Sequence, residues 1–307
     1  MLQNYGVTLS AINSTSKNDP QCSNRRTGIS CSVCPKGYSS TIGSYECEQC
    51  TQPSFVYISI LNVVFGLVLI SLLFLFNLTI VQGTINGISF YANIMYLYED
   101  IILQYAGAPF YNIILLLNFG TTFQSCFYDG MNEYDKNWLR FFFPFYLLLI
   151  VVLIIIGAHK CNLRVFKVTF IAKRAVPVLA TLMVLTYTNI LGIVMDSLRR
   201  STLHIYNRTT YQSYTVWLYQ PSLAYFQGKH LALAVFSIIV TVFYLIPLPM
   251  VILFGDLLRK YFHNLWFGHF LDVFHGAYRW PFGFWLGVRL LVRVTLMVLM
   301  YPFLQTG

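Results

Sequence analysis

Long apolar runs separated by short polar segments dominate the chain. The stretch from Phe55 to Ile80 contains no charged residue over 26 positions. A helix of this length exceeds the hydrocarbon thickness of a bilayer, so the stretch predicts a tilted transmembrane helix. Four further runs of the same character predict crossings at 139–158, 175–198, 231–255 and 282–301.

The segment 84–127 is less regular and is long enough to cross the membrane either once or twice. The charges on either side of the run 139–158 limit how often the segment 84–127 can cross. Loop 159–174 carries five Lys or Arg residues and no acid, whereas 129–137 is net acidic. Basic loops favour the cytoplasmic side, so the run 139–158 should pass from outside to inside. With the N-terminus outside, we expect one crossing near 86–107, followed by a segment that dips into the membrane or lies flat on its outer side.

The predicted fold class is an all-α membrane protein, a polytopic helical bundle of about six transmembrane helices. Residues 1–54 precede the bundle, are rich in Ser, Asn and Thr, and contain five of the seven cysteines. Such a segment cannot build a core without cross-links. The domains are therefore an extracellular cysteine-rich module, 1–54, and a multi-pass transmembrane domain, 55–307. In this topology 199–230 is an outer loop.

The cysteines of the module include two CxxC pairs with twelve residues between them. This spacing suits a zinc ribbon as well as a disulfide-linked module, but an oxidising compartment favours disulfides. Five cysteines leave one without a partner inside the module. Cys126, on the same side of the membrane in this topology, is one candidate for the sixth, and a cysteine upstream in a longer chain is the other. The disulfide candidates are Cys22, Cys31, Cys34, Cys47, Cys50 and Cys126.

Two glycosylation sequons fall on the outer side of this topology, at Asn13 and Asn207. A third, at Asn77, lies within the first apolar run and should not be used. Together with the orientation of the helices, these sites predict a glycoprotein of the plasma membrane with its N-terminus outside.

Composition supports the membrane assignment and excludes several functions. The chain is 57% hydrophobic, 17% aromatic and only 10% charged, with a mean hydropathy of +0.61. The net charge of +9 comes from Lys and Arg residues scattered between apolar runs, where they set topology and contact lipid head groups, so the bilayer and not nucleic acid is the expected partner. The sequence contains no enzyme motif, and no cofactor is expected.

Histidines do not indicate a metal site either. His263, His269 and His275 are six residues apart, which suits neither ligation from one helix face nor a zinc protease motif. Interleaved with basic and aromatic residues, they predict an amphipathic stretch at the cytoplasmic surface.

Ionisable residues inside predicted crossings are candidates for function, because they are costly to bury in a bilayer. Arg289 and Arg293 share a helix face. In one interpretation they snorkel to head groups or pair with an acid, and in the other they line a polar path with Glu99 or Asp100. The adjacent acids Glu99 and Asp100 favour the outer mouth of the bundle or a capping role. The full set of ion-path candidates is Glu99, Asp100, Asp196, Arg289 and Arg293, and Pro247 and Pro249 predict a hinge.

Two stretches resemble known families. The sequence CPKGYSSTIGSYECEQC, which ends at Cys50, resembles cysteine-rich repeats of the ephrin-receptor-like and growth-factor-receptor-like type. The later segments NFGTTFQSCFYDGMNEYDKNWLRFFFPFYLLLIV, PVLATLMVLTYTNIL, GKHLALAVF and FWLGVRLLVRVTL are similar, in this order, to the TRP-like multi-pass regions of large uncharacterised surface proteins of simple animals and protists. In that family such repeats lead directly into the membrane domain, and the helices continue beyond the point that corresponds to Gly307, which implies a C-terminally incomplete membrane domain here.

This chain departs from the family pattern where the relatives carry charge. Phe119, Gln124 and Asn189 replace charged residues, and Pro221-Ser222 replaces an Asp-Gly pair. These changes weaken the case for an ion site. We therefore favour a cell-surface receptor or adhesion-type protein that binds an unknown extracellular partner through its cysteine-rich module. The alternative is a TRP-like ion channel or transporter, and neither interpretation predicts an enzyme.

Overall fold

The computed structural model of the chain describes residues 22, 26–41, 47–50, 55–97, 127–160, 174–207, 210–261, 265–276, 278 and 282–303. Most of these residues are helical. The helices are α1 (Phe55–Leu75), α2 (Gly83–Leu97), α5 (Glu133–Lys160), α7 (Val176–Leu198), α8 (Gly228–Val240), α9 (Pro247–Leu253), α10 (Gly255–Tyr261), α11 (Leu265–His275) and α12 (Trp285–Phe303).

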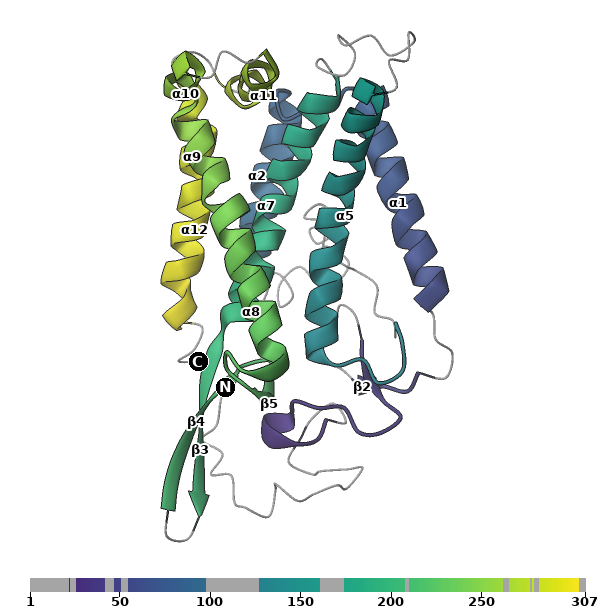
Figure 1. Cartoon of the computed structure of the whole chain (residues 1–307), viewed down its shortest axis with the longest axis vertical. Helices are drawn as coiled ribbons and strands as arrows, with labels where there is room; N and C mark the ends of the chain where they lie inside the picture. The colour runs from purple at the N-terminus through teal and green to yellow at the C-terminus, as the bar shows by residue number, and fades with distance from the viewer. Residues whose placement is uncertain are drawn as a thin grey trace.

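The long helices lie side by side and form a bundle with two distinct ends (Figure 1). The cysteine-rich module and a β-sheet lie at one end, called the module end below, and α10 and α11 lie at the other, called the opposite end. Four spans are long and apolar enough to cross a membrane: Glu133–Gly157, Val176–Leu198, Gly228–Leu253 and Phe282–Leu299. The chain therefore has the helices of an integral membrane protein, as the apolar runs predicted.

The other two expected crossings stay predictions. The described apolar stretch of α1, Ser59–Leu75, is shorter than those four spans. The crossing expected near 86–107 overlaps α2 and continues outside the described residues. The segment that was expected to dip or lie flat also lies outside them, apart from its last residue, Phe127.

Helix α7 is the centre of the bundle. Within its span 72% of the residues are buried, against 22% to 33% in the other three spans, whose remaining apolar side chains face outward as they would toward lipid. Tyr187, Ile190 and Ile193 of α7 are fully buried in the main core, where they pack with residues of α5, α8, α11 and α12. A second cluster joins α7 to α1 and α5 around Leu147 and Leu182.

Helices α8 and α9 are one interrupted span. A π-helical segment, Thr241–Leu245, joins them directly before Pro247. The amide of Ile246 donates to the carbonyl of Thr241 at 3.0 Å, five residues back, which is the π-helical pattern. The wider turn accommodates the proline rings of Pro247 and Pro249, which cannot donate a backbone hydrogen bond. The two prolines thus lie where the helix is interrupted, and their role as a hinge stays a prediction.

The segment predicted as an outer loop, 199–230, connects α7 to α8 and contains strands that the sequence analysis did not predict. The strands are β3 (Arg200–Asn207), β4 (Thr210–Trp217) and β5 (Gln220–Ala224), and they form an antiparallel sheet in the order β3-β4-β5. Strand β3 pairs with β4 from Arg200↔Trp217 to Asn207↔Thr210, and β5 pairs with the end of β4. The β3–β4 hairpin projects beyond the helices at the module end (Figure 1). Its strands are rich in Thr, Tyr, Val and Ile, which favour strands.

The cysteine-rich module contains a short 3₁₀ turn, Ile29–Cys31, and two small paired strands, β1 (Ser39–Ser40) and β2 (Cys47–Glu48). The expected disulfides are present as Cys22–Cys31 and Cys34–Cys47. Cys50 is also part of a disulfide, with a partner outside the described residues. These cysteines are therefore oxidised and do not hold zinc.

Candidate functional site

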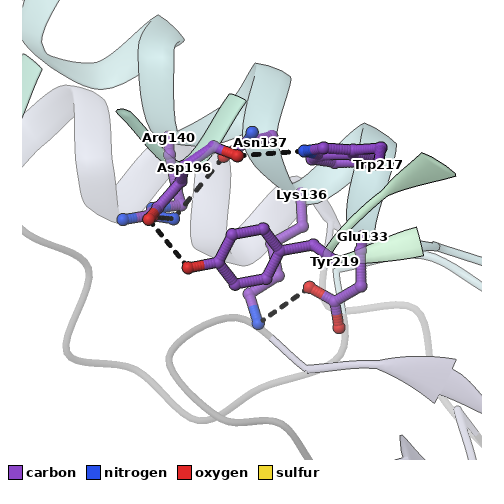
Figure 2. Close-up of a pocket in the computed structure, with 7 residues that line it drawn as sticks. All are labelled: Glu133, Lys136, Asn137, Arg140, Asp196, Trp217 and Tyr219. Carbon is purple, nitrogen blue, oxygen red and sulfur yellow. Dashed lines mark hydrogen bonds and ion pairs between the residues drawn. The ribbon is translucent and has the colours of Figure 1, made fainter. Parts of the chain in front are cut away.

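The module and the bundle meet at a polar cluster that we call the module junction. It lies at the module end, where α5 begins and where α7 ends next to the sheet (Figures 1 and 2). The cluster surrounds a small pocket and consists of Glu133, Lys136, Asn137, Arg140, Asp196, Trp217 and Tyr219.

Helix α5 begins in a way that places its charged residues toward the module. Asn132 caps the helix, since its side-chain oxygen accepts a hydrogen bond from the amide of Asp135 at 3.0 Å. The carboxylate of Asp135 lies 3.5 Å from the amide of Asn132, which completes a reciprocal cap. Burial raises the pKa of Tyr128, just before this cap, and its hydrogen bond to Asp135 raises the pKa further, so the phenol stays protonated.

Glu133 is the residue that joins the module to the bundle. Its Oε1 atom accepts hydrogen bonds from Arg26 Nη2 at 2.7 Å and from Ser40 Oγ at 3.1 Å, both in the module. Its Oε2 atom lies 3.5 Å from Nζ of Lys136, one turn along α5. Only 6% of the Glu133 side chain is exposed, so a carboxylate buried between two basic groups holds the module against α5.

Backbone contacts strengthen the same attachment. The amide of Ser40 donates to the carbonyl of Met131 at 2.9 Å, and the amide of Gly130 donates to Ser39 Oγ at 2.7 Å. Ser39 and Ser40 are buried, and Sγ of Cys50 lies 3.7 Å from the carbonyl oxygen of Tyr128. The module is thus docked on the start of α5 by several independent contacts.

Asp196 occupies the corresponding position on α7. Its Oδ2 atom pairs with Arg140 Nη1 at 2.8 Å, and its Oδ1 atom accepts a hydrogen bond from the hydroxyl of Tyr219 at 2.8 Å. Figure 2 shows this carboxylate facing Arg140 and Tyr219, with the Glu133–Lys136 pair on the other side of the Tyr219 ring. Asp196 therefore connects α5, α7 and the sheet.

The last turn of α7 is capped by side chains from the sheet and from α8. The carbonyl oxygens of Asp196, Ser197 and Leu198 lack the donor four residues ahead that a continuing helix would supply, although that of Asp196 accepts from the amide of Arg199 at 3.4 Å. They bind Nε1 of Trp217 at 2.9 Å, Nε2 of His230 at 3.0 Å and the hydroxyl of Tyr225 at 2.8 Å, respectively.

His230 has both ring nitrogens occupied in this cap. Its Nδ1 atom accepts from the amide of Phe226 at 3.0 Å, so Nε2 carries the proton that it donates to Ser197. The imidazole is therefore neutral and is held between the amide of Phe226 and the end of α7. Ser197 also binds Asn137 of α5 through its hydroxyl, at 3.0 Å.

The pocket in the junction has a volume of about 30 Å³. This volume holds little more than a water molecule, and its walls are ion-paired or hydrogen-bonded side chains. The junction is thus suited to coupling the module, the sheet and the helices, and not to binding an organic ligand.

The arginines of α12 form a second polar region, deeper in the bundle. Arg293 is buried and donates from Nη1 to Oγ1 of Thr188 in α7 at 3.1 Å. Arg289 lies one turn closer to the opposite end and donates to Oδ1 of Asn86 in α2 at 3.0 Å and to the hydroxyl of Tyr278. The described hydrogen bonds of the two guanidinium groups are therefore made inside the bundle.

The structure separates the predicted site residues. It places Asp196 in the module junction and Arg289 and Arg293 on α12, so these three do not share a site. Glu99, Asp100, Asn13 and Cys126 lie outside the described residues. Asn207 ends β3, and His275 lies 3.5 Å from Asp256 at the opposite end.

The residues that sequence reasoning missed are Glu133, Lys136, Arg140, Trp217 and Tyr219. Glu133 and Lys136 appeared only as charges that set topology. One signal was available, since an acidic and a basic residue three positions apart, just before an apolar run, can pair if the helix begins earlier than the run.

Comparisons with models of protein families, with curated proteins and with solved structures found no match for this chain.

Proposed function

We propose that this chain is a multi-pass cell-surface receptor or adhesion-type protein whose cysteine-rich module binds an external partner. The observation that carries the proposal is the attachment of the module to α5 through Glu133, which accepts from Arg26 at 2.7 Å and from Ser40 at 3.1 Å. A module that served only as a tether would not need a buried carboxylate shared with the first turn of a bundle helix. The resemblance of the module to ephrin-receptor-like repeats supports the same proposal.

The junction supports a relay from the module to the helices. Displacing Arg26 would leave Glu133 paired with Lys136 alone, and the neighbouring Arg140–Asp196 pair connects α5 to α7 and the sheet. Removing one partner of such a buried pair is costly, so the module and the ends of α5 and α7 should move together.

An adhesion assay on living cells tests this proposal. Cells that express the full chain should bind to one another or to a second cell type, and the double variant Cys34→Ser/Cys47→Ser, which lacks one module disulfide, should lose this binding at equal surface level. Surface biotinylation supplies the matched amounts. Equal binding by wild type and variant, at equal surface amounts, would contradict the proposal.

The alternative function is an ion channel or transporter. The observation that favours it is the buried Arg293 beside Thr188, close to a helix that is interrupted by a π-helical segment and two prolines. Interrupted helices and buried charges are common on transport pathways. Whole-cell recording distinguishes the two functions. The channel is favoured if wild-type cells carry a current and Arg293→Gln alters it at unchanged surface expression. The receptor is favoured if wild-type cells carry no current.

A further inference from the structure

The charge of the α12 arginines is not balanced by any described carboxylate. Arg26, Arg140 and Arg259 each pair with a carboxylate at 2.7 to 2.8 Å, whereas none of the ion pairs within the described part of the chain includes Arg289 or Arg293. The described partners of the α12 arginines are neutral. They are the side-chain oxygens of Asn86, Tyr278 and Thr188 and the ring of Phe90, whose centroid lies 4.0 Å from the guanidinium carbon of Arg289.

Both guanidinium groups also retain hydrogen-bonding capacity. The Nε atoms of Arg289 and Arg293 are buried and have no hydrogen-bond partner among the described residues. Arg293 is only 3% exposed, so water does not solvate it freely. A buried cation with an unused donor and no counter-charge is strongly unfavourable unless an anion compensates it.

We propose that Arg289 and Arg293 bind a phosphate group between α12, α2 and α7. Guanidinium groups match the oxygens of a phosphate better than any other side chain, because they offer several N–H donors in one plane. The two arginines are four residues apart on one face of α12, where Arg289 contacts α2 and Arg293 contacts α7. Asn86 and Tyr278 fix the orientation of Arg289, as second contacts do in anion sites.

The place of Arg289 in the bundle suggests two sources for the phosphate. It lies one turn after Trp285, the first residue of α12, and Trp285 and Phe284 are both exposed at the opposite end. Exposed aromatic residues at a helix end are typical of the membrane–water interface, where phospholipid phosphates lie. A lipid head group can therefore supply the phosphate from the membrane, and a free phosphate can supply it from solution.

Thermal unfolding of the full chain in a maltoside detergent, which contains no phosphate, tests the proposal. The five tryptophans report unfolding. Inorganic phosphate or short-chain phosphatidic acid, added near saturation, should raise the unfolding temperature of the wild type by about 5 °C or more above the effect of NaCl at equal ionic strength. A rise with the lipid alone identifies a head group, and a rise with inorganic phosphate alone identifies a soluble ligand.

The variants Arg289→Gln and Arg293→Gln should lose this rise, and Arg259→Gln should keep it. Arg259 is the matched control, since it is an exposed arginine at the same end of the bundle and pairs with Asp272. If a Gln variant does not fold, Arg289→Lys replaces it, because lysine keeps the charge but loses the planar donors and should weaken the rise.

Three results would overturn the proposal. The first is a wild-type rise no larger than that with NaCl. The second is a rise that Arg259→Gln reduces as much as Arg289→Gln does. The third is a rise that appears only in the double variant Glu99→Gln/Asp100→Asn, because it would mean that a carboxylate of the chain already occupies the arginines.

Discussion

At the scale of single residues, two ion pairs of equal length differ in their surroundings. Arg140 and Asp196 pair at 2.8 Å with side chains that are 27% and 24% exposed, and Arg259 and Asp272 pair at 2.8 Å with side chains about half exposed. The carboxylate of Asp196 also accepts from Tyr219, whereas among the described residues the carboxylate of Asp272 has Arg259 alone as its partner. Partial burial makes the first pair harder to replace by water.

We therefore expect Asp196→Asn to lower the free energy of unfolding by about 1–3 kcal/mol, because Arg140 loses its counter-charge in a partly buried place. Asp272→Asn is the matched control and should cost less than about 1 kcal/mol, as exposed pairs do. Thermal unfolding of both variants in detergent measures the difference. Equal losses would mean that the junction pair contributes no more than a surface pair.

Sequence reasoning found part of this site and missed the rest for a physical reason. Asp196 stood out because a carboxylate near the end of an apolar run is rare. Its partners Arg140 and Tyr219 are 56 and 23 residues away, and each looked like an ordinary flanking residue. Only the packing of α5 against α7, and of the sheet against both, brings them together.

At the scale of elements, the interrupted span α8–α9 depends on a contact from α7. In a regular helix the carbonyl of Leu245 would accept from the amide of residue 249, but Pro249 has no amide hydrogen. The hydroxyl of Tyr187 donates to this carbonyl at 2.8 Å and takes the place of the missing donor. The break is therefore a stabilised feature of the fold.

We expect Tyr187→Phe to destabilise the protein by about 1–2 kcal/mol, because the carbonyl of Leu245 loses its donor inside the bundle. In the background of Pro249→Ala, which restores an amide at position 249, the same substitution should cost less. A double-mutant cycle of thermal unfolding measures the coupling. The same loss in both backgrounds would show that the hydroxyl does not compensate for the proline.

The elements differed in how well the pattern of residues predicted them. The long apolar runs identified α5, α7, α8–α9 and α12, because a bilayer demands continuous apolar helices. The β3–β4 hairpin was missed although its residues favour strands, since the region was assigned as a loop from topology alone. In the sequence analysis, Asn207 at the end of β3 was recognised only as part of a glycosylation sequon.

At the scale of the whole molecule, the remaining disulfide decides how firmly the module is held. Cys50 is disulfide-bonded, and the cysteines of the chain not yet assigned are Cys126 and Cys161. Sγ of Cys50 lies 3.7 Å from the carbonyl of Tyr128, two residues after Cys126, whereas Cys161 follows the far end of α5.

Non-reducing peptide mapping should therefore recover Cys50 linked to Cys126. Such a bond joins the module covalently to the membrane domain beside the contacts of Glu133. Digestion of a Cys161→Ser variant should give the same linked peptide, and a peptide in which Cys126 is a free thiol would exclude the pairing.

The orientation of the molecule in the membrane can be decided by two sequons at opposite ends of the bundle. Asn207 ends β3 in the hairpin at the module end, whereas Asn77 lies in the exposed turn after α1, which leads away from that end (Figure 1). The sequence analysis placed Asn77 inside the membrane, because Asn77 belongs to the first apolar run. Because glycans are added only in the secretory lumen, one orientation exposes Asn207 to modification and the other exposes Asn77.

The charge bias of the loops places the module end outside, so we expect glycan at Asn207 and none at Asn77. A glycosidase-sensitive shift in gel mobility should accordingly shrink in Asn207→Gln and stay unchanged in Asn77→Gln. The reverse pattern would put the module in the cytosol, where disulfides are rarely maintained, and would remove the basis for an external partner. The same gel thus tests the orientation on which the receptor proposal depends, before any ligand is known.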